Sequence, residues 1–149
     1  MLGHTYADWS PTKGKQATEA FLAGNPQIDG IWSDSGITMV GAIEAFAEAK
    51  RPIPPMTAEP LNGFLRLAKE NNVEFLAVGF PPGQAARCAD TAISVLKGES
   101  VPNYVNVEAI SFTQTDIDKW YKPDFSDDLW VDVVDVLPEP ELVRLGLKR

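Results

Sequence analysis

The sequence predicts an α/β domain in which helices flank a mainly parallel sheet. Segments with helical periodicity alternate with short apolar runs between residues 12 and 112, and this alternation is typical of a parallel sheet. The chain has 149 residues, of which 44% are hydrophobic and 23% charged, so it can bury a sizeable core. The alternation begins with a helix that no strand precedes, which predicts an incomplete α/β layer.

The first predicted helix covers residues 12–24 and ends where Gly24 and Pro26 interrupt the pattern. Residues 28–32 form a short apolar run, which we interpret as a buried strand with Trp32 in the core. The apolar residues that share one face of the predicted helix at 12–24 are Ala17, Phe21 and Leu22.

Two more helices and a strand are predicted in the middle of the chain. Helical periodicity continues over residues 36–49, and a proline-rich stretch then leads into a short strand at 55–58. A third helix follows at 61–72 and ends at the pair Asn71 and Asn72. The expected buried stripe of the helix at 36–49 consists of Ile37, Val40, Ile43 and Ala47, with Phe46 as a further candidate.

The last strands and the last regular helix lie between residues 73 and 112. Residues 73–80 are mostly apolar and predict a strand, and a fourth helix follows at 84–97. Cys88 shares a face of this helix with alanines, so we expect it to be a small core residue. Residues 104–112 alternate apolar and polar side chains, as in a strand with one face in water.

The predicted α/β lobe occupies residues 1–112, and residues 113–149 form a C-terminal tail. The tail holds aromatic residues among acids and prolines. We expect it to wrap a surface of the lobe as a mixture of helix and coil.

Polar and aromatic side chains follow three of the predicted strands. In open parallel sheets, ligands bind beyond the carboxyl ends of the strands, so we expect these groups to line one cleft. Carboxylates and amides suit the hydroxyls of a sugar, and an aromatic ring suits its C–H face. The candidate ligand-binding residues are Ser33, Asp34 and Ser35 after the first strand, Glu59 and Asn62 after the second, Phe80 at the end of the third, and Trp9 in the irregular N-terminal segment.

Each candidate also has a purely structural interpretation. Serine and aspartate are preferred N-caps, so the segment 33–35 caps the helix that follows, binds a ligand, or does both. Glu59 and Asn62 are alternatively solvated turn residues. Phe80 at the end of an apolar strand fits the core as well as it fits a binding platform, and Trp9 fits either role.

Charge and composition argue against several classes of protein. The net charge is −8 and no basic cluster is present, which argues against a nucleic-acid partner. No run of 18 apolar residues predicts a transmembrane helix. The N-terminus lacks the basic start and apolar stretch of a signal peptide, so the chain as given is expected in the cytoplasm or without its leader. A single cysteine cannot form an internal disulfide.

Signals for catalysis and for metal binding are weak. His4 is the only histidine, and no nucleophile–histidine pair can be assembled around it. The sequence has no zinc-ligand spacing and no phosphate-binding glycine loop after a strand. Asp124, Asp127 and Asp128 lack the regular alternation of a calcium loop. We therefore expect a binding protein that is not an enzyme and that has no metal or cofactor.

Four segments carry a resemblance to a known family: NPQIDGIWSDSGITMVGAIEAFAEAKRP, AEPLNGFLRLAKE, VGFPPGQAARCADTAISVLKGESVP and FTQTDIDKWYKPDFSDDLW. In this order they resemble the sugar-binding proteins of bacterial ABC importers, the ribose-binding or type I periplasmic binding proteins. The resemblance implies two Rossmann-like lobes that close on a sugar, of which this chain holds only the C-terminal part. It also implies sugar contacts from the loop 33–36, Glu59 and Phe80. The family often has asparagine-aspartate in that loop and aspartate in place of Glu59. Because this chain differs at both places, the resemblance does not identify the sugar.

The partial resemblance has consequences for this chain. In the complete fold, the chain after Phe80 returns to the first lobe, so the helix at 84–97 would pack on structure that this chain lacks. A bare face of roughly 400 Å² forfeits about 10 kcal/mol of burial at ~25 cal/mol per Å². That is comparable with the whole stability of a domain, about 5–15 kcal/mol. We therefore expect a homo-oligomer formed through helix 84–97, and weak or no sugar binding by half a cleft.

Three functions remain open at this point. The first is the substrate-binding component of a sugar ABC importer, which is periplasmic when it is full-length with a signal peptide and which partners ABC permease subunits. The second is the effector-binding core of a sugar-responsive transcription repressor, although no DNA-binding helix-turn-helix is visible. The third is a small α/β enzyme of unknown class.

Overall fold

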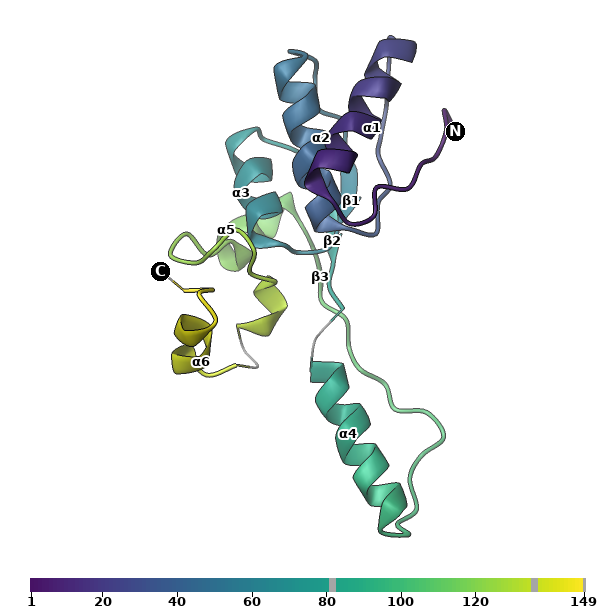
Figure 1. Cartoon of the computed structure of the whole chain (residues 1–149), viewed down its shortest axis with the longest axis vertical. Helices are drawn as coiled ribbons and strands as arrows, with labels where there is room; N and C mark the ends of the chain where they lie inside the picture. Colours follow the sequence, from purple (N-terminus) through teal and green to yellow (C-terminus); the bar gives the residue numbers. More distant parts are fainter. Residues whose placement is uncertain (81–82, 135–136, 149) are drawn as a thin grey trace.

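The structure is a computed structural model, and it describes residues 1–80, 83–134 and 137–148. A small sheet has helices α1, α2 and α3 on one side, α4 projects away from this body, and the C-terminal tail returns to it (Figure 1). In chain order the elements are α1 Pro11–Gly24, α2 Gly36–Glu48, β1 Met56–Ala58, α3 Asn62–Glu70, β2 Phe75–Val78, α4 Gly83–Leu96, β3 Ser111–Thr113, a 3-10 turn Gln114–Asp116, α5 Ile117–Trp120, a second 3-10 turn Val131–Val133, and α6 Glu139–Arg144. The predicted alternation of helix and strand is confirmed.

The first two helices pack closely at two glycines, one in each helix. A Cβ atom added to Gly41 of α2 would lie 1.9 Å from the carbonyl oxygen of Pro11, and one added to Gly14 of α1 would lie 2.4 Å from that of Thr38. The backbones therefore touch, and neither position has room for a side chain. Thr18 of α1 is buried. The predicted apolar face of α1, formed by Ala17, Phe21 and Leu22, is only half-buried.

The sheet is mixed, with the order β1–β2–β3. β1 and β2 pair in parallel, and β3 pairs antiparallel with β2. The strand predicted at 28–32 is reduced to a single parallel bridge between Ile31 and Met56. The strand predicted at 104–112 is reduced to Ser111–Thr113, because residues 101–110 are largely exposed and pair with the sheet only at their end.

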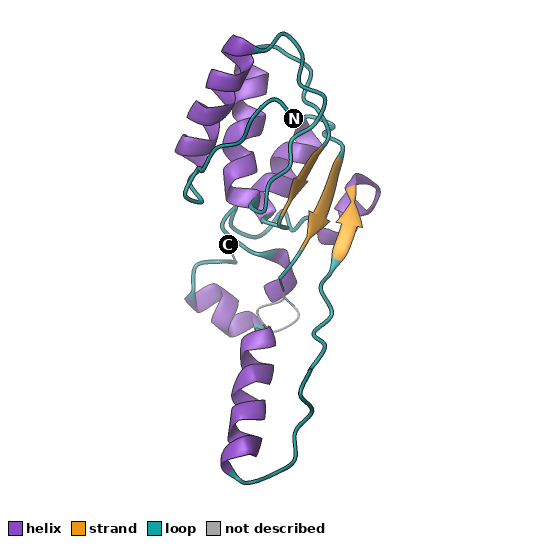
Figure 2. Ribbon diagram, turned by 90° about the vertical axis from the view of Figure 1, so that its right-hand side faces the viewer, coloured by secondary structure: helices purple, strands orange, loops and turns teal. Residues whose placement is uncertain are grey.

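Trp32 does not lie in the core, and the prediction that it does was wrong. Its exposed fraction is 81%. Successive side chains of an extended segment point to opposite faces, so Trp32 points away from the buried side to which Ile31 and Met56 belong. Leu76 and Val78 of β2 are exposed on this opposite face too. Figure 2 shows the helices gathered on the other side, and no helix among the described residues covers this open face.

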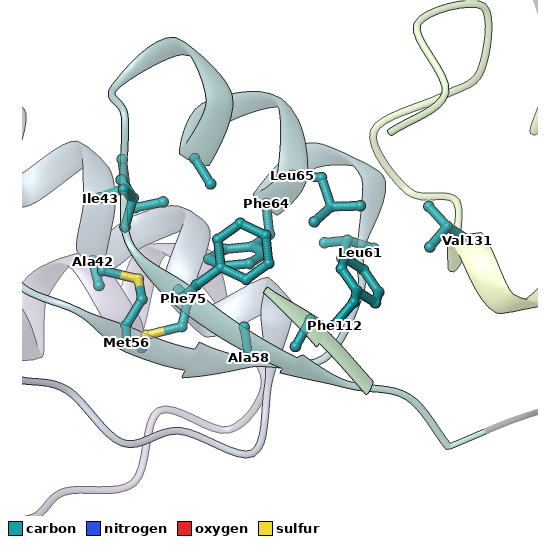
Figure 3. Packing of buried hydrophobic residues seen from close by; sticks show 14 of the residues in the cluster. Ala42, Ile43, Met56, Ala58, Leu61, Phe64, Leu65, Phe75, Phe112 and Val131 are labelled. Atoms are coloured by element: carbon teal, nitrogen blue, oxygen red, sulfur yellow. The ribbon is translucent and has the colours of Figure 1, made fainter. Parts of the chain in front are cut away.

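The core lies between the sheet and helices α2 and α3 (Figure 3). Its aromatic rings form a connected series. Phe75 makes edge contacts with Phe64 and Phe112, with centroids 5.2 and 6.0 Å apart, and Phe112 stacks on Trp120 at 4.9 Å. The tail thus joins the same core, to which it also contributes Leu129, Val131 and Leu142.

Helix α4 contributes no buried residue and extends from the rest of the chain (Figures 1 and 2). Cys88 is exposed, so the prediction of a core cysteine was wrong. The reason is that none of the described residues buries the small-residue face of α4. In α2, Ala47 is exposed, contrary to prediction, whereas Ile43 and Phe46 are buried as expected. Within the described ranges, no helix has the length and apolar character needed to cross a membrane.

Candidate ligand-binding site

The structure brings together the loops at the carboxyl ends of the strands. A Cβ added to Gly36 would lie 2.4 Å from the carbonyl oxygen of Glu59 and 3.0 Å from Cβ of Leu61, so the first loop presses on the second. A Cβ added to Gly79, at the end of β2, would lie 3.2 Å from Cγ of Pro60. The expected convergence of three segments at one edge of the sheet is therefore present, and it depends on two glycines at the contacts.

The loop 33–36 is held by its own serines and by β1. The hydroxyl of Thr57 accepts a hydrogen bond from the backbone N–H of Ser33 and donates one to its carbonyl, both at 2.8 Å. The hydroxyl of Ser33 accepts from the N–H of Ser35 at 3.1 Å. Ser35 is buried and caps α2 by accepting from the N–H of Thr38 at 3.3 Å. Both serine side chains thus serve the loop, and Asp34 between them is exposed.

Three carboxyl groups share this edge of the sheet. Burial raises the pKa of Glu59 above its ordinary value of 4.5, and the negative charges of Asp34 and Asp132 raise that pKa further. Burial also raises the pKa of Asp132. The edge is therefore rich in hydrogen-bond acceptors. Donors such as hydroxyl groups would stabilise the ionised form of these carboxyl groups.

Asp132 is a residue of this site that the sequence analysis missed. Its Oδ1 atom is buried without a hydrogen-bond partner among the described residues, and its Oδ2 atom would lie 2.9 Å from a Cβ on Gly79. It comes from the tail, whose aspartates all look alike in the sequence. The one available signal is that Asp132 stands alone in the apolar run LWVDVV, where a solvated acid is out of place.

Asn62 has a structural role, and its geometry does not support the expected ligand contact. The side chain is 1% exposed. Its Nδ2 donates to the carbonyl oxygens of Lys122 at 2.9 Å and Ser126 at 3.1 Å, and its Oδ1 accepts from the N–H of Lys122 at 2.9 Å. With these bonds the amide fastens the tail to α3, both of its N–H donors are used, and its burial keeps it away from a ligand in the cleft.

The two aromatic candidates are both presented to solvent. Phe80 is 68% exposed directly after β2, which excludes the core interpretation for this residue. Trp9 is 67% exposed just before α1, in a turn where it and Asp8 both have φ of 48°. This left-handed conformation is uncommon for residues other than glycine. Arg51, just after the C-terminal end of α2, donates to carbonyls at the C-terminal end of α1. The two helices therefore run in the same direction. Trp9, just before α1, thus lies at the end where α2 begins.

The geometry suits a polar, uncharged ligand better than a metal. The residues that the structure describes include no group of three or more His, Cys, Asp or Glu side chains placed to hold a metal ion. What the edge offers is the exposed carboxylate of Asp34, the half-buried carboxyl of Glu59 and the exposed ring of Phe80.

Comparison with solved structures shows the same fold in proteins with bound sugars. A protein from Mycobacterium smegmatis in complex with β-D-fucofuranose is 25% identical, with a TM-score of 0.67 over 77% of this chain and 39% of that one. The periplasmic binding component of the arabinose ABC transporter of Shewanella sp. ANA-3, bound to L-arabinofuranose, is 19% identical, with a TM-score of 0.69 over 78% and 41%. A solute-binding protein from Agrobacterium vitis with bound D-fucose is 21% identical, with a TM-score of 0.66 over 79% and 41%. The chain thus spans about two-fifths of the length of these proteins.

Comparison with family descriptions assigns the chain directly. No curated protein matches the sequence. The family described as periplasmic binding protein domain matches residues 2–100, which is about two-thirds of the chain. The chain therefore belongs to the periplasmic binding protein domain family.

Proposed function

We propose that this chain forms one side of the sugar cleft in the solute-binding receptor of a bacterial ABC importer. The observation that carries the proposal is the cluster of acceptors and one exposed ring at the carboxyl edge of the sheet, in a chain of this family. Support comes from the similar structures, which hold fucofuranose, arabinofuranose and fucose. The ligand is a monosaccharide or a similar small polar solute.

Individual residues have distinct roles in this proposal. Asp34 and Glu59 accept hydrogen bonds from sugar hydroxyls, and Phe80 offers its ring to a C–H face. Ser33 and Ser35 shape the loop that presents Asp34, because their hydroxyls are used in it. Trp9 borders the same end of the helix layer. Asn62 is not part of the proposed cleft.

Sugar binding by this chain alone is weak in our proposal. A cleft that closes from two sides removes its ligand from water, so that hydrogen bonds inside it are not in competition with solvent. At this edge Asp34 is exposed and Glu59 is half-buried, so hydrogen bonds that a sugar makes to them compete with water. We expect dissociation constants for monosaccharides in the millimolar range or weaker.

An NMR titration tests the site. Unlabelled aldoses are added to the ¹⁵N-labelled chain, and shift changes are expected to concentrate at residues 33–36, 59 and 80. Asp34→Asn and Glu59→Gln should each reduce these changes several-fold, because each removes a charged acceptor. Glu44→Gln is the matched control, since Glu44 is exposed on α2 and makes the same change of charge elsewhere. Changes that are absent for every aldose, or unaffected by the two site variants, would contradict the proposed site.

The macromolecular partner and compartment follow from the same proposal. An importer's receptor acts in the periplasm and delivers its sugar to ABC permease subunits. Antibody detection in fractionated source cells tests this placement. A band in the periplasmic fraction is expected, and a band confined to the cytoplasm would contradict the importer role. The effector-binding core of a repressor would give that second result.

A further inference from the structure

The chain exposes more surface than its size requires. Its accessible surface is 9388 Å², whereas a compact monomer of 16.3 kDa is expected to expose about 7,500 Å². The excess is about 1,900 Å², more than twice the ~800 Å² that one partner contributes to a standard interface. An excess of this size is as large as one partner's share of a permanent dimer interface.

Part of this excess lies on α4. The helix has a polar face, on which Thr91 and Ser94 are half-buried, and an apolar face that is open to solvent. Leu96 is 86% exposed and Ile93 is also exposed. Helical spacing places Ile93 and Leu96 next to a row of small residues, so the face is both apolar and flat. The small residues of this face are Ala85, Cys88, Ala89 and Ala92.

A second part lies on the open face of the sheet. Trp32, Leu76 and Val78 are exposed there, on the side opposite α2 and α3. A shallow groove runs over Trp32, Thr57 and Leu76, with Glu74 at its border. In an α/β layer such a face is the surface on which a helix packs, and its apolar side chains are spaced to receive one.

We propose that two copies of this chain associate by laying α4 of each on the open sheet face of the other. The two surfaces have matching character: a flat apolar helix face and an apolar strip of sheet around an exposed tryptophan. α4 leaves the body at the end of β2 and points away from the sheet to which it is attached, which directs it outward (Figure 2). A two-fold axis makes both contacts at once, so each chain contributes both a helix and a sheet face.

Charge favours α4 as the element that docks. The whole chain carries −8, which opposes the approach of two copies. The segment 83–97 is the opposite in sign, with Arg87 and Lys97 against the single acid Asp90. The groove on the partner's sheet face, where α4 would dock, has Glu74 at its border. Helical spacing places Arg87 on the side of α4 away from its apolar face, so the positive net charge of this segment lowers the general repulsion between two copies and does not pair directly with Glu74.

The test is the mass of the chain in solution, by light scattering coupled to gel filtration at micromolar concentration. The expected mass is twice 16.3 kDa. Ile93→Glu combined with Leu96→Glu should weaken association on the order of 30-fold or more, and so should Trp32→Glu on the sheet. Ser94→Glu, on the polar face of α4, is the control that should remain dimeric. Leu76→Lys is a second sheet variant if Trp32→Glu does not fold.

Mixing the variants distinguishes this arrangement from other dimers. The α4 double variant retains an intact sheet face, and Trp32→Glu retains an intact α4, so an equimolar mixture of the two should recover a heterodimer with one sound contact. A wild-type chain that is monomeric throughout, as when α4 folds back on its own sheet, would overturn the proposal. So would a Trp32→Glu variant that stays fully dimeric, because two α4 helices would then be pairing with each other. Neither result depends on sugar binding.

Discussion

The side-chain amide of Asn62 pairs with both backbone groups of Lys122, accepting from its N–H and donating to its carbonyl, each at 2.9 Å. These atoms are 60 residues apart in the sequence. The amide thus imitates the pairing of a neighbouring strand and fixes the start of the tail against α3.

Asn62→Ala should therefore destabilise the fold by about 2–4 kcal/mol, because it leaves buried backbone groups of the tail without partners. Asn71→Ala is the control, since Asn71 is exposed and, among the described residues, its side chain bonds to the carbonyl of Leu67 alone. We expect less than about 0.5 kcal/mol for that change. Urea unfolding measures both, and equal losses for the two variants would contradict the role assigned to Asn62.

Asp132→Asn should stabilise the protein at neutral pH. Burial raises the pKa of Asp132 above its ordinary 3.8, so the folded state binds this proton more tightly than the unfolded chain. Stability is then gained as the pH falls through the raised folded pKa toward 3.8, and lost as the pH rises. The asparagine removes that loss, which amounts to a few tenths to about 1 kcal/mol after solvent screening.

The variant should also flatten the dependence of stability on pH between pH 3.8 and neutrality. Unfolding midpoints measured across that range provide the check. Asp128→Asn, at an exposed position of the tail, serves as the control and should leave the slope unchanged. A slope that is the same for wild type and Asp132→Asn would show that Asp132 does not carry this effect.

Gly41→Ala should separate α1 from α2. The added methyl group would lie 1.9 Å from the carbonyl oxygen of Pro11 and 2.7 Å from the backbone nitrogen of Lys15, and neither of these backbone atoms can rotate away. We expect a loss of about 1–3 kcal/mol or more. Gly24→Ala is the matched control, because a Cβ there meets nothing within 4 Å and alanine should stabilise the helix by about 0.4–1 kcal/mol. Opposite signs in thermal unfolding are the expected result.

Arg66→Lys should weaken the second attachment of the tail. The guanidinium donates to Asp127 through Nε and Nη2, at 2.9–3.2 Å, and to Glu70 through Nη1. These bonds raise the pKa of Arg66 further above its ordinary value. Lysine can make only one of these contacts well, so a loss of about 0.5–1 kcal/mol is expected, decreasing with added salt. Arg144→Lys at the exposed surface of α6 should change stability less, and an equal effect would argue against a special role for Arg66.

The helices and central strands could be predicted from the sequence because local patterns determine them. The apolar periodicity of α2 and the serine at its N-cap, for instance, sit within a few residues of each other. The proximity of Asp34 and Glu59 could be predicted for the same kind of reason, since the ends of parallel strands meet at one edge.

What could not be predicted depends on partners that are distant or outside the chain. Trp32 and Cys88 are residue types that are often buried and lie in apolar patterns. Both are exposed, because no described part of this chain covers them. Asp132 reaches the site, and Asn62 leaves it, because of where the tail lies, and no periodicity in residues 113–149 specifies that.

The isolation of α4 has a consequence for how the chain folds. Isolated helices shorter than about 12–15 residues are marginal in water, and α4 has 14 residues, none of which is buried. Its coil-to-helix equilibrium therefore depends on the surface against which it packs. Helix formation in this segment and its docking then occur as a single cooperative step. Far-ultraviolet circular dichroism should then increase in helical signal with protein concentration, and amide hydrogens of residues 84–96 should exchange fastest in dilute solution. In this chain the fourth helix is a segment whose structure is completed by binding.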